Sequence, residues 1–319
     1  MDGGPRLVDR LRIDPAREHA ALIAGLRAPQ AAVSPKYFYD AVGCALFAAI
    51  CELPEYYPTR TERAIFAAHR DAIVRAVGRG TTLVDLGAGD GRKAVAWFDA
   101  LATRRYLAVD IARDALAATL AALRHEHPAI DATGIVTDFT QGLDLDADLG
   151  AGPVTFFYPG SSIGNFEPAA ARRFAAGIAR HCASRPGSGL LIGVDTRKDP
   201  ARLVAAYDDA AGVTAAFNRN VLVHVNRVAP ANFAPAGFLH RATYDEARGR
   251  VSMHLEATRP QTVDIDGAAR TFATGERIHT EDSYKYAPAE FTALLEGAGF
   301  RSVERWQDAA GDFAVYFAR

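Results

Sequence analysis

The chain has 319 residues, of which 49% are hydrophobic and 23% charged, and its formal net charge is −2. These values are ordinary for a globular protein and permit a sizeable core. No block of like charge stands out, so we expect no nucleic-acid binding through a basic face. No apolar run is long enough to span a membrane, and the first residues lack the apolar stretch of a signal peptide. We therefore expect a cytoplasmic protein without membrane contact, and a monomer by default.

The three cysteines show no metal-ligand spacing. Cys44 and Cys51 stand in one segment with a helical pattern, and Cys182 is far from both in the sequence. We expect Cys44 and Cys51 to be small core residues rather than a disulfide or a zinc pair, and we expect no metal site.

Strands and helices alternate from residue 81 onward. Before that point the pattern is mixed, although Thr59 and Glu62 are spaced as a capping box for a helix over residues 61–77. Strands are expected over residues 81–87, 104–110, 131–139, 153–160 and 189–195, and helices over 93–102, 112–127, 167–183 and 199–210. This order is typical of a parallel, doubly wound sheet.

The pattern changes after Gly212. A helical segment over 213–226 leads into alternating segments over 238–258 and 261–274, whose turns indicate hairpins. The chain then returns to a helix over 288–300 and to two final strands, 301–308 and 313–319. A helix followed by an antiparallel pair is the ending expected of the sheet in methyltransferases that use S-adenosylmethionine (SAM).

We therefore predict an α/β protein of two parts. A Rossmann-like SAM methyltransferase core, doubly wound around a mainly parallel sheet, would comprise residues 61–212 and 284–319. A second, smaller substrate-binding lobe would comprise residues 1–60 and 213–283.

The strongest local signal is the glycine-rich turn in residues 83–93, LVDLGAGDGRK. Gly87 and Gly89 allow a tight turn and a close approach of the backbone to a ligand, and Lys93 follows at the start of a helix. SAM carries an ammonium and a carboxylate where a dinucleotide carries a pyrophosphate. An acidic residue beside the turn therefore favours SAM over NAD, although the spacing alone leaves NAD open.

Acidic residues also end the next two strands. Asp110 could accept hydrogen bonds from both ribose hydroxyls, and Asp138 could bind the adenine amino group while the Phe139 ring packs on the base. The alternative is that each carboxylate caps the following helix. Three acids at successive strand ends favour a nucleotide site.

Asn165 follows the fourth strand in the segment YPGSSIGNFEP. Open α/β sheets bind ligands at the carboxyl ends of their strands, which would place Asn165 near the transferred methyl group. Its alternative role is the N-cap of the next helix.

Several unusual segments together carry a family resemblance. They are KYFYDAVGCALF (36–47), LPEYYPTRTE (53–62), GSSIGN (160–165), KDPARLVAAYDD (198–209), VTAAFNRNVL (213–222) and EDSYKY (281–286). From about residue 34 to the end, the chain resembles the L-histidine Nα-methyltransferases of ergothioneine biosynthesis. That family trimethylates the α-amino group of histidine to hercynine with SAM as co-substrate.

The resemblance also implies roles for single residues. Those resembling histidine-binding residues are Tyr57, with Tyr56 as the alternative, and Asn165, Tyr207, Met253, Glu281 and Ser283. Those resembling SAM-binding residues are Gly87, Lys93, Asp110, Asp138 and Phe139. Tyr39 would lie near both ligands and, with Asn165, near the reacting groups.

The pair Glu281 and Ser283 separates histidine from a rival substrate. On a strand the two side chains share one face, and together they suit the donor and the acceptor of an imidazole ring. The alternative function is N-methylation of another amino acid such as tryptophan or a derivative. An indole has no ring acceptor, so this pair argues against it.

Overall fold

The computed structural model describes residues 6–11 and 14–319, which form two compact units. The first contains residues 6–11, 60–196 and 286–319, and the second contains residues 14–59 and 197–285. The largest differences from the expected boundaries are at two places. Residues 197–212 group with the second unit rather than with the core. The strand β1 (Arg6–Asp9) joins the first unit because it pairs in parallel with β4 (Asp131–Val136).

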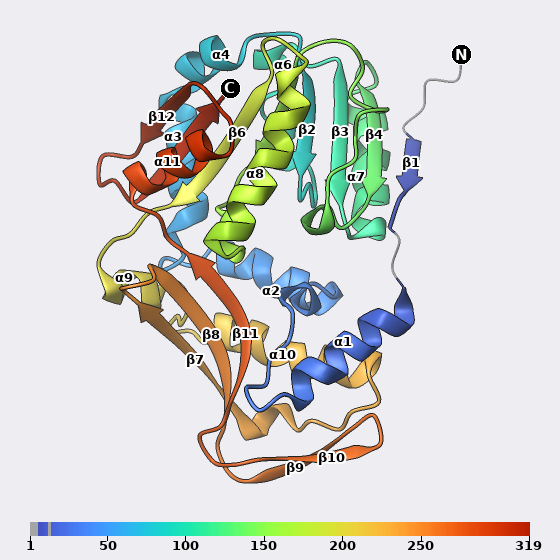
Figure 1. Ribbon diagram of the computed structural model, residues 1–319, viewed down its shortest axis with the longest axis vertical. Helices are drawn as coiled ribbons and strands as arrows, with labels where there is room; N and C mark the ends of the chain where they lie inside the picture. Colours follow the sequence, from blue (N-terminus) through green and yellow to red (C-terminus); the bar gives the residue numbers. More distant parts are fainter. Residues whose placement is uncertain (1–5, 12–13) are drawn as a thin grey trace. The chain divides into compact units, whose positions relative to one another are not determined.

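One eight-stranded sheet organises the first unit, with the order β1-β4-β3-β2-β5-β6-β13-β12 (Figure 1). Its remaining strands are β2 (Thr82–Leu86), β3 (Arg105–Asp110), β5 (Val154–Tyr158), β6 (Gly189–Asp195), β12 (Val303–Gln307) and β13 (Phe313–Ala318). Neighbours from β1 to β6 pair in parallel, whereas β13 pairs antiparallel with both β6 and β12. The predicted doubly wound sheet with an antiparallel ending is confirmed.

Helices cover this sheet. They are α3 (Tyr57–Ala68), α4 (Arg70–Val77), α5 (Arg92–Val95), α6 (Phe98–Leu101), α7 (Arg113–Glu126), α8 (Pro168–Ala183) and α11 (Pro288–Gly297), with short 3-10 turns η2 (Phe139–Gln141) and η3 (Ser162–Asn165). The single helix predicted over 61–77 is two helices that meet at His69. Since α3 already begins at Tyr57, the predicted capping box of Thr59 and Glu62 is wrong.

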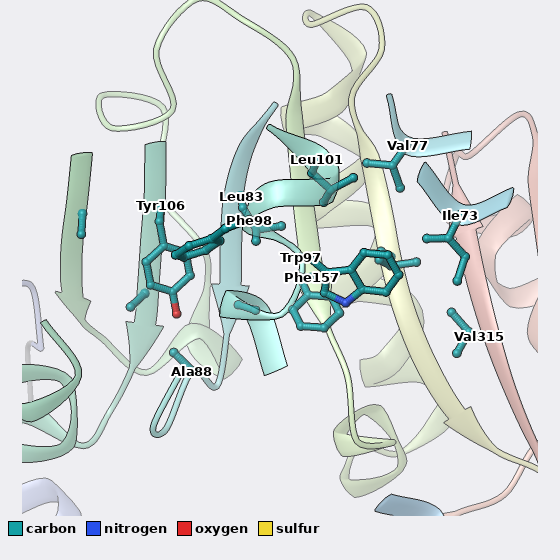
Figure 2. Close-up of a cluster of buried hydrophobic side chains, with 14 of the residues drawn as sticks. Ile73, Val77, Leu83, Ala88, Trp97, Phe98, Leu101, Tyr106, Phe157 and Val315 are labelled. Atoms are coloured by element: carbon teal, nitrogen blue, oxygen red, sulfur yellow. The ribbon is translucent and has the colours of Figure 1, made fainter. Parts of the chain in front are cut away.

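Large aromatic side chains fill the core between the sheet and α5–α6 (Figure 2). The Phe98 and Tyr106 rings meet edge to face with centroids 5.2 Å apart, and Trp97 and Phe157 belong to the same buried cluster. Burying a side chain of this size contributes roughly 1.5–3 kcal/mol. Ala88 belongs to the same buried cluster, so core packing holds the turn after β2 in place.

The second unit is built on a three-stranded antiparallel sheet of β7 (Phe238–Asp245), β8 (Arg250–Ala257) and β11 (Arg277–Tyr284), in the order β11-β8-β7. A separate ribbon pairs β9 (Gln261–Ile265) with β10 (Ala268–Phe272). Both predicted hairpins are confirmed. In the second, Asp266 and Gly267 have φ of 53° and 74°, the paired positive angles of a type I′ turn.

Helices complete the second unit. They are α1 (Pro15–Arg27), α2 (Ala41–Cys51), α9 (Pro200–Ala205) and α10 (Val213–Val228), with the turns η1 (Pro35–Phe38) and η4 (Pro235–Gly237). The stacked rings of Phe38 and Phe217, 4.4 Å apart, join η1 to α10 within the buried core of this unit. Cys44 is exposed on α2, so the expectation that it is a core residue is wrong, whereas Cys51 and Cys182 are partly buried.

Two kinds of feature are absent from residues 6–11 and 14–319. None of the helices there is long and apolar enough to cross a membrane. Nor do these residues gather three or more His, Cys, Asp or Glu side chains in a way that could hold a metal ion.

Candidate functional site

The glycine turn after β2 has the backbone that its sequence predicts. Gly87, Gly89 and Gly91 have φ of 73°, 52° and 69°, a region that favours glycine. The Gly87 N–H donates to the Val109 carbonyl over 2.8 Å, which ties the turn to the end of β3. A Cβ at Gly89 would meet no atom within 4 Å, so its Cα faces open space. The turn therefore presents a backbone surface that a ligand can approach closely.

Asp110 is held in a fixed orientation at the end of β3. One carboxylate oxygen accepts from the Gly89 N–H and the other from the Ala112 N–H, both over 2.9 Å. Each oxygen keeps a further lone pair, because a carboxylate offers about four acceptor positions. The N-cap of α7 is Ala112, so Asp110 does not take the alternative role of helix cap. The arrangement can accept a pair of hydroxyl groups.

Asp138 and Phe139 follow β4. Asp138 is the N-cap of η2, and one of its carboxylate oxygens accepts from the Thr140 N–H over 3.0 Å. Asp138 therefore does cap the following turn, which was the alternative role. The Phe139 ring meets that of Tyr158 edge to face, with centroids 5.9 Å apart. Its outer carbon lies 4.0 Å from the position a Cβ on Gly87 would take. The ring therefore flanks the glycine turn.

A buried carboxylate that the sequence analysis missed holds Lys93. The Lys93 ammonium donates to Glu62 over 2.7 Å, and the other Glu62 oxygen accepts from the Gly160 N–H over 2.7 Å. Glu62 is 1% exposed, and a Cβ at Gly193 would come within 2.0 Å of it. Glu62 thus links the start of α5 to the loop after β5. Because the spacing of Glu62 from Thr59 matches a capping box, the sequence did not indicate this role.

Asp85 lies beneath the turn and is 2% exposed. Burial raises the pKa of its carboxyl to about 7, although the Tyr106 hydroxyl, which donates to it over 2.8 Å, lowers the pKa. The charges of Asp110 and Asp90 raise this pKa further, whereas Lys93 lowers it. This acid therefore exchanges its proton near neutral pH, unlike a surface aspartate.

Asn165 is the last residue of η3, and its side chain is exposed. The N-cap of α8 is Glu167, so Asn165 does not serve as that cap. Ser161, with φ of 59°, accepts from the Asp195 N–H over 2.9 Å and fixes the preceding loop to β6. Asn165 therefore lies at the carboxyl end of β5, as predicted.

Glu281 and Ser283 share one face of β11, as the i and i+2 spacing predicts. They are 8% and 4% exposed, and they lie opposite Met253 and Val251 of β8 in the register. The register shifts between His279 and Glu281, which marks a β-bulge. A bulge changes the direction in which the side chains of its strand point. The predicted residues Met253, Glu281 and Ser283 are thus brought to one face of one sheet.

Tyr207 adds a hydroxyl to this face. It donates to Ser283 over 2.8 Å and accepts from the Lys285 ammonium over 2.8 Å. Lys285 also donates to Ser283 over 2.8 Å. Lys285 stands in the segment EDSYKY but could not be assigned a role from the sequence, because nothing in a sequence marks a lysine as buried.

The two neighbouring tyrosines have different surroundings. The Tyr57 hydroxyl accepts from Lys198 over 2.7 Å, and Arg202 lies over its ring. The Tyr56 ring instead meets Tyr207 edge to face, with centroids 6.4 Å apart. Burial raises the pKa of Tyr56 well above its ordinary value, and the nearby Tyr207 and Glu281 raise it further. The structure thus groups Tyr56, the alternative, with Tyr207 and Glu281.

Tyr39 belongs to the same aromatic group. Its side chain is 43% exposed, and its ring meets Phe47 and Phe217 at 6.1 and 6.2 Å between centroids. Phe47 in turn meets Tyr56 at 6.2 Å. Aromatic faces therefore run from Tyr39 to Tyr207, next to the hydrogen-bonding pair on β11. Whether each of these residues contacts a ligand stays a prediction.

Comparison with known proteins agrees with this geometry. Residues 18–319 match the family model described as histidine-specific methyltransferase, SAM-dependent. A histidine N-alpha-methyltransferase of Mycolicibacterium smegmatis is 42% identical over 301 residues, which cover 92% of each chain. An ergothioneine biosynthesis protein 1 of Neurospora crassa is 31% identical over 278 residues, 84% of this chain and 31% of that protein.

The fold has a counterpart among solved structures. A SAM-dependent methyltransferase of Clostridium acetobutylicum superposes with a TM-score of 0.50 at 9% identity, covering 86% of this chain and 98% of that one. The likeness supports the predicted fold class. With the family match over nearly the whole chain, it follows that the protein belongs to the histidine-specific, SAM-dependent methyltransferases.

Proposed function

We propose that the enzyme transfers methyl groups from SAM to the α-amino group of L-histidine, three in succession, and forms hercynine for ergothioneine biosynthesis. The observation that supports histidine as the substrate is the pair of Glu281 and Ser283, which places a hydrogen-bond acceptor and a hydroxyl on one buried face of β11. The names of the relatives support the same substrate and pathway.

The first unit is proposed to bind SAM. Gly87 and Gly89 offer a backbone surface that side chains would fill, and Asp110 has acceptor positions left for a ribose diol. Phe139 flanks the turn, where an aromatic ring can stack on adenine. Lys93, held by Glu62, supplies a cation suited to the carboxylate of the amino-acid tail. These residues fit the chemical groups of the donor.

The second unit is proposed to bind histidine. Glu281 accepts a hydrogen bond from the imidazole N–H, and Ser283 serves the other ring nitrogen. Tyr56 and Tyr207 are assigned to the carboxylate, and Tyr56 replaces Tyr57 because its ring contacts Tyr207. Met253, 2% exposed and opposite Glu281 in the register, is assigned to packing against the ring.

The chemistry is an in-line displacement that asks mainly for positioning. The lone pair of the neutral α-amine attacks the methyl carbon, the carbon–sulfur bond breaks, and the sulfur leaves without its charge. The amine proton passes to water or to a tyrosine. Asn165, a neutral amide, can orient the amine without placing a fixed cation beside the developing ammonium. Aromatic faces such as Tyr39 can hold the cationic product with roughly 0.5–2 kcal/mol.

Mass spectrometry of histidine incubated with SAM tests the proposal. We expect a product heavier by three methyl groups and stoichiometric S-adenosylhomocysteine. Tryptophan methylated faster than histidine would refute the substrate. The proposal also takes the enzyme to be a cytoplasmic monomer that needs no metal, so a chelator should leave the rate unchanged and light scattering should give the mass of one chain.

A further inference from the structure

Lys285 is a fully buried lysine at the end of the substrate-facing strand. Its side chain is 1% exposed, and its Nζ donates to Ser283 Oγ and to Tyr207 Oη, each over 2.8 Å. A lysine ammonium has three protons and no lone pair, so it can only donate. Each of these contacts therefore makes the partner oxygen an acceptor.

The contacts determine where the Ser283 proton can point. Ser283 Oγ accepts from Lys285 and also from the Tyr207 hydroxyl, over 2.8 Å in both cases. A serine oxygen has two lone pairs and one proton. With both lone pairs engaged, the remaining interaction that Ser283 can make is to donate its own proton.

We propose that Lys285 is a positioning residue that makes Ser283 an obligate hydrogen-bond donor, so that the enzyme binds the neutral imidazole ring of histidine in a single tautomer. This inference rests on the proposed function. The Glu281 carboxylate accepts, so the ring N–H faces Glu281 and the unprotonated nitrogen faces Ser283. An imidazolium ion would instead point a second N–H at a donor and bring a cation close to Lys285.

Other titratable groups surround the same face. Tyr207, Cys51, Glu281 and Tyr39 are near enough to Tyr56 to influence its pKa. On β7, His240 donates through Nε2 to the Tyr207 carbonyl over 2.7 Å. Burial lowers the pKa of His240, although that hydrogen bond and the nearby Asp208 raise it. These groups belong to the enzyme and act on any bound amino acid, so comparing two substrates removes their contribution.

The test therefore compares histidine with β-(1,2,4-triazol-3-yl)alanine. The triazole keeps one N–H and an acceptor nitrogen but does not gain a proton between pH 5 and 8, whereas a free histidine ring titrates near pH ~6.5. We expect the ratio of kcat/KM, histidine over triazole, to be level above pH ~7.5 and to fall by about tenfold per pH unit below pH ~6. A constant ratio from pH 5 to 8 overturns the inference.

Lys285→Met separates the role of the lysine from that of the fold. Without Lys285, Ser283 regains a lone pair and the cation is removed, so the acid fall in the ratio should disappear or move down by at least about one pH unit. A fall identical to that of the parent enzyme overturns the assignment to Lys285. Thermal protection by S-adenosylhomocysteine verifies that the variant is folded.

A spectroscopic measurement covers the case in which Lys285→Met does not fold. Nitrogen NMR of ring-labelled histidine, bound to the unmodified enzyme with S-adenosylhomocysteine at pH 5.5, should show one protonated and one unprotonated ring nitrogen. Two protonated nitrogens overturn the inference. If the unmodified enzyme methylates neither histidine nor the triazole, the proposed function is refuted instead. That outcome differs from a constant kcat/KM ratio and from two protonated ring nitrogens, which overturn only the inference about Lys285.

Discussion

The proposed donor and acceptor regions are built in different ways. On the donor side the backbone N–H groups of Gly87 and Gly89 fix the turn to Val109 and Asp110, and backbone N–H groups orient the Asp110 carboxylate. On the acceptor side, Tyr207, Ser283 and Lys285 bond through their side chains. Recognition that relies on backbone tolerates few changes, whereas recognition by three or four side chains can be redirected by single substitutions.

Glu281→Ala should produce the largest effect and should affect one region only. Losing a hydrogen bond to a charged group costs about 1.5–3 kcal/mol, so the Kd for histidine should rise by roughly 10- to 150-fold. The affinity for S-adenosylhomocysteine should change by less than about twofold. Isothermal calorimetry with each ligand measures both quantities.

Glu256→Ala is the matched control for that experiment. Glu256 lies on β8 and pairs with Arg241 and Arg277, away from the face that carries Glu281. We expect its histidine affinity to match that of the parent enzyme. If Glu281→Ala lowers the affinities for histidine and for S-adenosylhomocysteine equally, then the donor and acceptor regions are not separate.

Asp85→Asn tests whether the donor region contains an acid that burial keeps protonated. The folded pKa of about 7 lies above the ordinary aspartate value of 3.8, so the folded state loses stability as pH rises from about 4 through 7. Asparagine has no such penalty. Between pH 5 and 8 the variant should gain roughly 2–3 kcal/mol relative to the parent enzyme, as measured by denaturant unfolding.

The control for this pH series is Asp99→Asn, an exposed carboxylate on α6. Its difference from the parent enzyme should stay nearly constant over the same range. If Asp85→Asn runs parallel to Asp99→Asn, then Asp85 is ionised in the folded protein and the donor region has no buried acid near neutral pH.

The donor region could be predicted from the sequence more fully than the acceptor region. Strand–helix alternation and the glycine turn are local patterns, so the sheet and the positions of Asp110, Asp138 and Asn165 could be predicted. The strand β1 could not, because a four-residue edge strand has too little alternation to detect. Glu62 was misread because its spacing from Thr59 fits a helix cap, while its partners Lys93 and Gly160 lie far along the chain.

Long-range side-chain contacts set the limit on the acceptor side. Only the family resemblance brought Tyr207, Glu281 and Ser283 together in the sequence analysis. It left Tyr56 and Tyr57 open, because adjacent residues point in different directions and the sequence did not reveal that α3 begins at Tyr57. Lys285 was missed because burial of a charged residue depends on partners that no local pattern reveals.

A pair of phenylalanine variants sharpens the acceptor side. Tyr56→Phe removes a hydroxyl beside Tyr207 and Glu281, so KM for histidine should rise by about tenfold, the loss of one neutral hydrogen bond. Tyr57→Phe removes the acceptor of Lys198 and should lower the unfolding midpoint while changing KM by less than about threefold. Steady-state kinetics and thermal melting distinguish them. The reverse pattern would restore the original assignment to Tyr57.

Gly89→Ala should produce the smallest effect and tests whether the donor region depends on its backbone shape. Gly89 has φ of 52°, where an alanine costs about 1 kcal/mol, and its Cβ would point into open space. Gly267→Ala in the β9–β10 hairpin is the matched control, with φ of 74° and no atom within 4 Å. Both variants should lose similar stability. Only Gly89→Ala should raise the Kd for SAM, by roughly fivefold, because the new methyl group occupies the surface that SAM approaches. Equal SAM affinities in calorimetry would mean that the donor does not lie against this turn.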